Sequence, residues 1–261
     1  MWNCKTIVKT FVGMLIAASP TIAGDLAEIE AKLTEKLGQI QSFRGDMVMT
    51  AQIKEPVKVT QKMTGKVAGL LADGKYYTRQ EGKSVRTIEM GDTPQTIEGD
   101  MLNVVDGEFS WSEQSANGQK AVMKAKPTTS PPLGKDYLTK LREEFDLTRA
   151  ADAAADGAEC WVIEAKFKQP RQAPGPQPEK LVLFFRQSDG AMVRTLGVLP
   201  DGNTLFTMDY SNIQLNPKLS ASDFAYAPPE GVKVVDRTAP PAPNAASGPA
   251  ITPTSAPSGG K

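Results

Sequence analysis

The chain has 261 residues, with 30 Lys and Arg, 30 Asp and Glu, no histidine and two cysteines. Without histidine there can be no Ser-His-Asp or Cys-His catalysis and no histidine-bearing zinc site, and two cysteines cannot form a four-cysteine site. A formal net charge of zero argues against nucleic-acid binding, which needs an excess of Lys and Arg on one face.

The N-terminal residues 1–23 have the organisation of a secretory signal peptide. Lys5 and Lys9 precede an uncharged, mostly apolar run from Thr10 to Ala18, and Thr21-Ile22-Ala23 places small residues at −3 and −1 of a cleavage site. The apolar run is much shorter than the roughly 20 residues that span a bilayer. The alternative is a buried N-terminal helix or strand, but the order of charges favours a cleaved signal and an exported protein.

The two cysteines support this interpretation. Cys4 precedes the apolar run, whereas a lipoprotein signal has its acylated cysteine directly after it, so we expect no lipidation of the protein itself. Cleavage would leave Cys160 alone, and no internal disulfide could form. Cys160 shares a strand face with Glu164 and Lys166 and has no neighbouring base, which favours an inert thiol over a reactive one.

The remaining residues predict one folded domain, residues 24–237, followed by a tail. The tail, residues 238–261, is rich in Pro, Ala and Ser and carries almost no charge, which predicts disorder. At the other end of the domain, Asp25 is an N-cap with Glu28 three residues later. Apolar residues then follow at helical spacing and predict an amphipathic helix as far as Gln41. After Ser42 the period changes to two, which predicts a half-buried strand.

From residue 57 onward, Asp-Gly pairs recur between runs rich in β-forming residues, which is a strong signal for hairpins. We therefore predict a long antiparallel meander with strands at 57–71, 76–80, 84–90, 101–105, 108–113, 121–126, 160–168, 179–187, 191–199 and 204–211. A second amphipathic helical stretch, Lys135 to Phe145, interrupts it. The segment Gln169 to Pro178, with its four prolines, is predicted to be a stiff exposed loop.

The search for catalytic groups finds no convincing set. Glu143 and Glu144 are adjacent on a predicted helix and are typical of a solvated face. No Asp-x-Asp-x-Asp calcium motif is present, and a Ser-x-x-Lys pattern at Ser115 fails because position 118 is Gly. We predict a protein that is not an enzyme and needs neither metal nor cofactor; a secreted hydrolase is the disfavoured alternative.

The apolar residues of the predicted strands are more informative. Several methionines and aromatic residues fall on strand faces, and methionine adapts its shape to irregular apolar partners. Such a surface suits a cavity for variable ligands, but the same pattern is typical of ordinary core residues under two helices. The residues in question are Met47, Met49, Met63, Met208, Phe43, Phe206 and Tyr210.

Two segments of the chain carry a recognisable pattern. Leu102–Trp111 (LNVVDGEFSW) reads as a strand, an Asp-Gly turn and a strand with Trp, and Asp223–Asp236 (DFAYAPPEGVKVVD) contains the ending Phe-x-Tyr-x-Pro-Pro-x-Gly-Val. With these segments the chain resembles the periplasmic outer-membrane lipoprotein carriers of the LolA type, from about Leu26 to Asp236, and the ending is the most specific part of the resemblance. Asp156 to Phe167, Leu181 to Phe185, Asp189-Gly190 and Met208 to Tyr210 are also similar to the closing half of that family. The early Ser42-Phe43-Arg44-Gly45 fits its beginning more weakly.

This resemblance implies a mainly β fold: an unclosed antiparallel β-barrel, or half-barrel, with α-helices lidding a hydrophobic cavity. The cavity would be lined by Met47, Met49, Met63, Trp111, Leu183, Phe185, Phe206, Met208 and Tyr210. The lid would present Leu33, Leu37, Leu138, Leu141 and Phe145.

The resemblance also implies a function. The protein would be a monomeric periplasmic carrier that binds lipoprotein acyl chains. It would take acylated lipoproteins or lipids from an inner-membrane lipoprotein-releasing transporter to an outer-membrane acceptor. The alternative keeps the fold but changes the cargo: a LolA-like lipid-binding or envelope-stress-sensing protein.

Overall fold

The computed structural model describes residues 26–54, 57–90, 93–116, 118–127, 131–169 and 176–239. The predicted signal peptide and most of the predicted tail lie outside the described residues, and so does much of the predicted proline-rich loop.

Two α-helices are present in the described chain, α1 (Leu26–Gly38) and α2 (Tyr137–Glu144). The apolar spacing of α1 buries Ile29, Leu33 and Leu37 on one side, as predicted. The second helix is shorter than predicted, because Phe145 is the first residue of a strand. From Phe145 onward the burial alternates with period two, which is a strand period, and the segment pairs with a neighbouring strand.

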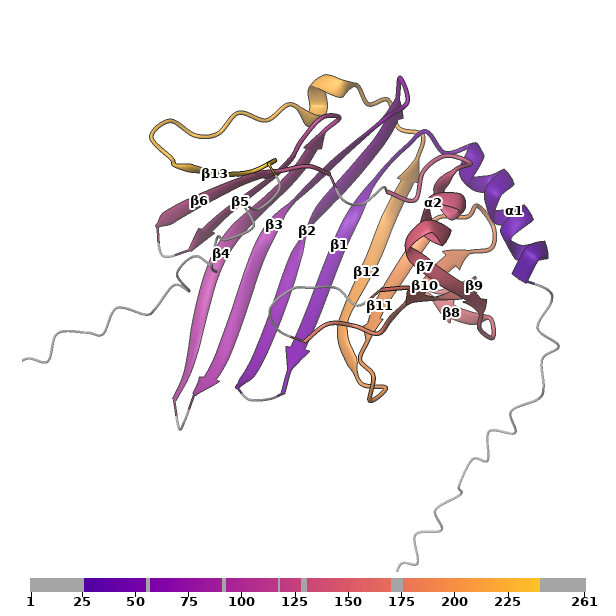
Figure 1. Cartoon of the computed structure of the whole chain (residues 1–261), viewed down its shortest axis with the longest axis horizontal. Helices are drawn as coiled ribbons and strands as arrows, with labels where there is room; N and C mark the ends of the chain where they lie inside the picture. The colour runs from indigo at the N-terminus through magenta and orange to yellow at the C-terminus, as the bar shows by residue number, and fades with distance from the viewer. Residues whose placement is uncertain are drawn as a thin grey trace, which may run out of the picture.

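The strands form one large curved sheet with two unpaired edges (Figure 1). The strands are β1 (Ser42–Ile53), β2 (Lys58–Ala72), β3 (Lys75–Met90), β4 (Thr93–Asp106), β5 (Ser110–Ala116), β6 (Gln119–Ala125), β7 (Phe145–Arg149), β8 (Ala153–Ala155), β9 (Ala158–Phe167), β10 (Lys180–Arg186), β11 (Met192–Val198), β12 (Thr204–Leu215) and β13 (Val234–Arg237).

The order of the strands in the sheet is β13-β6-β5-β4-β3-β2-β1-β12-β11-β10-β9-β7, with β8 also pairing β9. Neighbours are antiparallel except β13 and β6, which are parallel. Because β13 and β7 do not pair with each other, the sheet is an unclosed barrel, and the predicted fold class is confirmed.

Strands β3 and β4 are longer than the sequence pattern predicts. The predicted strands 76–80 and 84–90 are one continuous strand, and β4 begins at Thr93 rather than Met101. These extensions are mostly polar on both faces, so no apolar alternation marks them. They are held by backbone pairing with β2 and with each other along their whole length.

The hairpin signals mark turns as predicted. Asp73 and Gly74 both have positive φ, 52° and 71°, and join β2 to β3. Asp156 and Gly157 repeat this geometry, 52° and 71°, between β8 and β9. Two residues with positive φ are what a type I′ turn requires, and Asp-Gly is a pair that tolerates it.

The two faces of the sheet are covered differently. We call the face on which α1 and α2 pack the inner face; Figure 1 shows both helices at the β7–β11 end of the sheet. The largest core cluster lies there, where Leu33, Leu37 and Leu138 from the helices meet Ile163 and Phe185 from the sheet. On the opposite, outer face a 3-10 helix, η1 (Ala221–Phe224), and its flanking residues pack over β2, β3 and β4.

Candidate functional site

An open cleft of about 930 Å³ lies between α2 and the inner face of the sheet. Strands β10, β11 and β12 supply its apolar wall, and α2 with the start of β7 borders it. The segment 176–178 and the β2–β3 and β4–β5 turns complete it. The apolar and aromatic lining residues are Tyr76, Val105, Pro127, Tyr137, Leu141, Phe145, Phe167, Pro176, Pro178, Leu181, Leu183, Met192, Leu205, Phe206, Met208 and Tyr210.

The register of the strands explains why apolar side chains gather here. Leu183 of β10 pairs with Thr195 of β11, and Thr195 pairs with Met208 of β12. Met208 in turn pairs with Met49, and Met49 with Met63. Residues directly opposite each other on paired strands point to the same face, with Cβ atoms about 4.5–5.5 Å apart. The five side chains therefore form one row across five adjacent strands.

A cluster of methionines lies beside the cleft wall on the same face. Met47 and Met63 are 1% and 2% exposed and pack with Met49, Met208 and Tyr210. Because methionine side chains are flexible and apolar, this cluster can adjust the shape of the wall that it supports.

The predicted cavity residues divide into three groups. Four of them line the cleft directly: Leu183, Phe206, Met208 and Tyr210. Three form the methionine cluster beside it: Met47, Met49 and Met63. The other two lie elsewhere. Phe185 is fully buried in the core under α2, with its ring centroid 6.4 Å from that of Tyr137.

Trp111 does not line the cleft, and its predicted place in the cavity is corrected. It pairs with Val104, which is on the outer face, and its ring centroid lies 5.3 Å from that of Tyr226. Phe224 completes this outer cluster. The two sequence segments that carry the family resemblance thus meet on the outer face, where they fasten the C-terminal segment to β2–β5. The sequence misleads here because β5 is short and its period does not reveal which face is apolar.

The predicted lid residues also separate. Leu33, Leu37 and Leu138 are buried in the closed core beneath the helices. Leu141 of α2 and Phe145 of β7 line the cleft. Phe145 packs on Phe167, with ring centroids 4.5 Å apart, and belongs to the wall of the cleft rather than to a helix. Of the two helices, α2 therefore borders the cleft.

Few polar groups lie inside the cleft, and their contacts keep them uncharged. The Tyr210 hydroxyl donates to Met208 Sδ at 2.7 Å, and Thr195 Oγ1 donates to Met192 Sδ at 3.5 Å. Burial raises the pKa of Tyr210 and of Tyr137. Both phenols therefore stay neutral at physiological pH.

Charged side chains occur at the rim. Lys75 and Lys140 both border the cleft, and the Lys140 Nζ is 4.4 Å from the centre of the Tyr76 ring. Glu143 and Glu144 of α2 also border the opening. The cleft thus combines an apolar interior with a wet, charged edge, an arrangement that suits the binding of an amphiphile.

Sequence reasoning misses several lining residues. Leu181, Met192 and Thr195 lie on predicted strands but are not among the predicted cavity residues. Thr195 is polar, so the apolar pattern of its strand does not indicate it. Tyr76 reaches the cleft from β3, far along the sheet. Pro176 and Pro178 belong to the predicted loop, where Pro176 is exposed as predicted, and both also line the open cleft.

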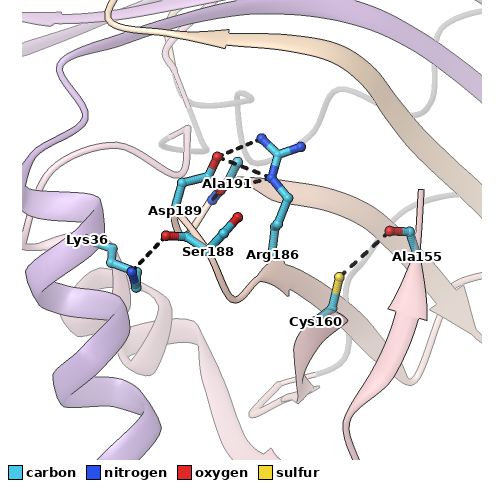
Figure 2. Close-up of polar contacts among 7 residues, drawn as sticks. All are labelled: Lys36, Ala155, Cys160, Arg186, Ser188, Asp189 and Ala191. Atoms are coloured by element: carbon cyan, nitrogen blue, oxygen red, sulfur yellow. Dashed lines mark hydrogen bonds and ion pairs between the residues drawn. The ribbon is translucent and has the colours of Figure 1, made fainter. Parts of the chain in front are cut away.

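Helix α1 is fixed to the turn between β10 and β11 (Figure 2). Lys36 Nζ donates to the Ser188 carbonyl oxygen at 2.9 Å. The turn itself is held by Arg186, which binds the Asp189 carboxylate through Nε at 3.0 Å and through a terminal nitrogen at 2.7 Å. Gly190, with φ +79°, lets the helix approach, because a Cβ there would lie 2.8 Å from Lys36 Cβ. These contacts hold the helix that covers the core.

Cys160 is also drawn in Figure 2, and it lies on the outer face of β9. Its side chain is fully buried, and Sγ is 4.0 Å from the Ala155 carbonyl oxygen. Burial raises the pKa of the thiol, so it stays protonated and unreactive at neutral pH.

Asp106 organises the turn between β4 and β5 beside the cleft. Its Oδ1 accepts from the amides of Glu108 and Phe109 at 2.9 and 2.8 Å, and its Oδ2 accepts from Trp111 Nε1 at 2.7 Å. Partial burial favours the neutral acid, but these hydrogen bonds outweigh it and lower the pKa of Asp106. The Asp-Gly-x-x-x-Trp spacing is therefore a structural device of this turn.

We expect Asp106 to make stability depend on acidic pH. Because its folded pKa is depressed, its contribution is full above the unfolded value of about 3.9 and disappears as pH falls through the folded pKa. Asp106→Asn should lower the free energy of unfolding at pH 7 by on the order of 1–2 kcal/mol and flatten its fall in acid. Urea unfolding at pH 7, 5, 4 and 3 measures this; equal losses of the variant and the parent across the series would contradict it.

Two negative observations apply to the residues that the structure describes. Neither helix there is long and apolar enough to cross a membrane. No three Cys, Asp or Glu side chains in those ranges gather closely enough to hold a metal ion.

Comparison with known proteins gives distant similarities. No protein-family model matches the sequence. The uncharacterized protein MJ0687 of Methanocaldococcus jannaschii is 24% identical over 211 residues, covering 80% of this chain and 53% of that protein. The chain thus spans about half the length of the curated relative that it matches.

The solved structures that resemble the chain are also distant in sequence. An uncharacterized conserved protein from Thermus thermophilus has a TM-score of 0.49 at 12% identity, covering 82% of this chain and all of that one. A chain of the MucA/MucB complex of Pseudomonas aeruginosa has a TM-score of 0.43 at 14% identity. The match covers 78% of this chain and 62% of that one. A LolA superfamily protein, NE2245 from Nitrosomonas europaea, has a TM-score of 0.28 at 11% identity. The match covers 76% of this chain and 97% of that one.

Proposed function

We propose that this protein is a periplasmic carrier that binds the acyl chains of lipoproteins in the cleft under α2. It would carry them from an inner-membrane releasing transporter to an outer-membrane acceptor. The observation that supports this most is the cleft itself: an open, mostly apolar space bounded by Leu183, Phe206 and Met208 and bordered by a charged rim.

The size of the cleft is compatible with such a ligand. Small-molecule sites typically measure roughly 300–1,000 Å³, and this one, at about 930 Å³, lies at the upper end. Each CH₂ group removed from water contributes about 0.8 kcal/mol, so ten of them contribute on the order of 8 kcal/mol before the cost of ordering the chain. Apolar burial alone can therefore supply useful affinity without any catalytic group.

The chemistry of the lining supports binding rather than turnover. The Tyr210 hydroxyl is neutral and already donates a hydrogen bond to Met208 Sδ, and the sequence has no histidine. A flexible methionine wall would suit cargo whose acyl chains differ in length. Binding without any covalent step also fits transport, because a carrier must release its cargo unchanged.

Native mass spectrometry tests the proposal on protein recovered from the periplasm. We expect a mass adduct that is lost on solvent extraction and restored when a synthetic triacylated lipopeptide is added. An unacylated peptide of the same sequence is the control and should give no adduct. A mass that stays unchanged with the lipopeptide would overturn acyl binding.

A transfer assay then separates lipoprotein transport from another lipid-binding or envelope-stress-sensing role. Membrane vesicles containing the releasing transporter and a defined lipoprotein are incubated with ATP and the purified protein. Appearance of the lipoprotein in the soluble fraction, as a complex with this protein, is the expected result. Acyl binding without such release would indicate the other role.

A further inference from the structure

We infer that Met208 is an oxidation-sensitive modification site whose conversion to the sulfoxide weakens acyl binding. The inference rests on the proposed function and names a way in which the same cleft could be regulated. It starts from the position of the thioether, which lies in the wall of the cleft.

The methionines of the inner face differ in accessibility. Met47 and Met63 are 1% and 2% exposed, whereas Met208 is only partly buried and lines the open cleft. A dissolved oxidant can therefore reach Met208 through the cleft, while the buried pair is shielded. Met192 is a second partly buried methionine that lines the cleft, and each of the two sulfurs accepts a hydroxyl, so a variant at Met208 is needed to separate the two thioethers.

The reaction is a two-electron oxidation by hydrogen peroxide or by hypochlorous acid. With hydrogen peroxide, the sulfur lone pair attacks one oxygen, an S–O bond forms, the O–O bond breaks, and the remaining proton and hydroxide leave as water. With hypochlorous acid, the sulfur attacks chlorine and releases hydroxide, and a water oxygen then displaces chloride from sulfur, so that the net products are the sulfoxide, chloride and one proton. The product, methionine sulfoxide, is polar and chiral and is reversed by methionine sulfoxide reductases.

The neighbours of Met208 explain why the product would matter. Its side chain stands in one row with Thr195 and Met49, so a new sulfoxide oxygen would stand among the side chains of the cleft wall. An acyl chain over that oxygen would remove it from water and offer no hydrogen-bond donor. Tyr210 Oη, which donates to Met208 Sδ at 2.7 Å, would have to turn from the sulfur to the new oxygen or to another acceptor. Oxidation would thus make the cleft wall polar at Met208.

The experiment measures the affinity of a palmitoylated fluorescent peptide for the purified protein before and after limited treatment with hypochlorous acid. Sulfoxides are mapped by peptide mass spectrometry. We expect affinity to fall about 10-fold, equivalent to about 1.4 kcal/mol. It should recover after incubation with methionine sulfoxide reductase, and bound peptide should slow oxidation at Met208.

Two variants assign the effect to one residue. Each is compared with its own affinity before oxidation, so any direct effect of the substitution cancels. Met208→Leu conserves volume, and the affinity of this variant for the peptide should not fall after oxidation. Met123→Leu removes a half-buried methionine of β6 that does not line the cleft, and its affinity should still fall.

The outcomes separate the two proposals. If the reduced protein binds no palmitoylated peptide, the proposed function fails and the inference fails with it. If the reduced protein binds and affinity survives full oxidation of Met208, the inference alone is overturned. A fall that persists in the Met208→Leu protein would likewise overturn it.

Discussion

Replacing Met208 with tryptophan is expected to weaken the binding of an acylated peptide by at least about 100-fold, which corresponds to about 2.7 kcal/mol. Met208 lies partly exposed in the wall of the cleft, in register with Thr195 on one side and Met49 on the other. A tryptophan there has room to turn only toward the open space, because neighbouring strands occupy both sides. Its ring would take volume that an acyl chain needs.

The matched control is Val85→Trp on the outer face of β3. Val85 is 39% exposed and pairs with Lys62 of β2, so a larger ring there meets solvent. Titration of a palmitoylated fluorescent peptide should give unchanged affinity for this control. Thermal unfolding checks that both proteins are folded, since overpacking of a half-buried site costs about 1–3 kcal/mol. Equal affinity of the Met208→Trp protein and the parent would show that acyl chains bind elsewhere.

The sequence predicts those parts of the fold that local chemistry determines. The apolar spacing of α1, the Asp-Gly turns and the alternating strands all describe short-range preferences, and the structure contains them. The full length of β3 and β4 is set instead by long-range backbone pairing, which leaves no apolar pattern behind. Phe145 shows the same limit: its helical neighbours suggest a helix, but pairing with Phe167 makes it the start of a strand.

For the candidate site, the sequence indicates which residue types are present but not which of them meet. Phe206, Met208 and Tyr210 are predictable because a strand period places them on one face, and they line the cleft together. The prediction for Trp111 rests on a segment that resembles a family, and this residue packs on the outer face with Tyr226. The most recognisable segments thus hold the C-terminal residues against the sheet, whereas the less distinctive apolar strands form the wall of the cleft.

The two helices have different tasks. The buried side of α1 closes the main core, and its end is held by Lys36 on the β10–β11 turn. The α2 helix borders the cleft and is tied to α1 by Arg142, whose terminal nitrogen lies 2.6 Å from both Glu30 carboxylate oxygens. Exposed ion pairs contribute little stability, about 0–1 kcal/mol. We therefore expect α1 to be the firmly held helix, with α2 more easily displaced.

The firm attachment of α1 predicts a large effect at Gly190. Substitution by alanine adds a Cβ that would lie 2.8 Å from Lys36 Cβ, and it also places a side chain at a φ of +79°. Gly202 has a similar φ of +82° in the β11–β12 turn, but nothing lies within 4 Å of its added Cβ. Gly202→Ala therefore carries only the backbone cost, which is roughly 1–2 kcal/mol for a left-handed residue.

Gly190→Ala should lower the free energy of unfolding by the same backbone cost of roughly 1–2 kcal/mol. It should lower it by about 1–3 kcal/mol more because the end of α1 has to move away from the turn. The two free energies of unfolding are measured by urea denaturation under the same conditions, and their difference isolates the contact between α1 and the β10–β11 turn. Hydrogen exchange should also quicken in α1 of the Gly190→Ala protein and stay unchanged in the Gly202→Ala protein. Equal losses of stability in both variants, with unchanged exchange in α1, would mean that the turn does not hold the helix.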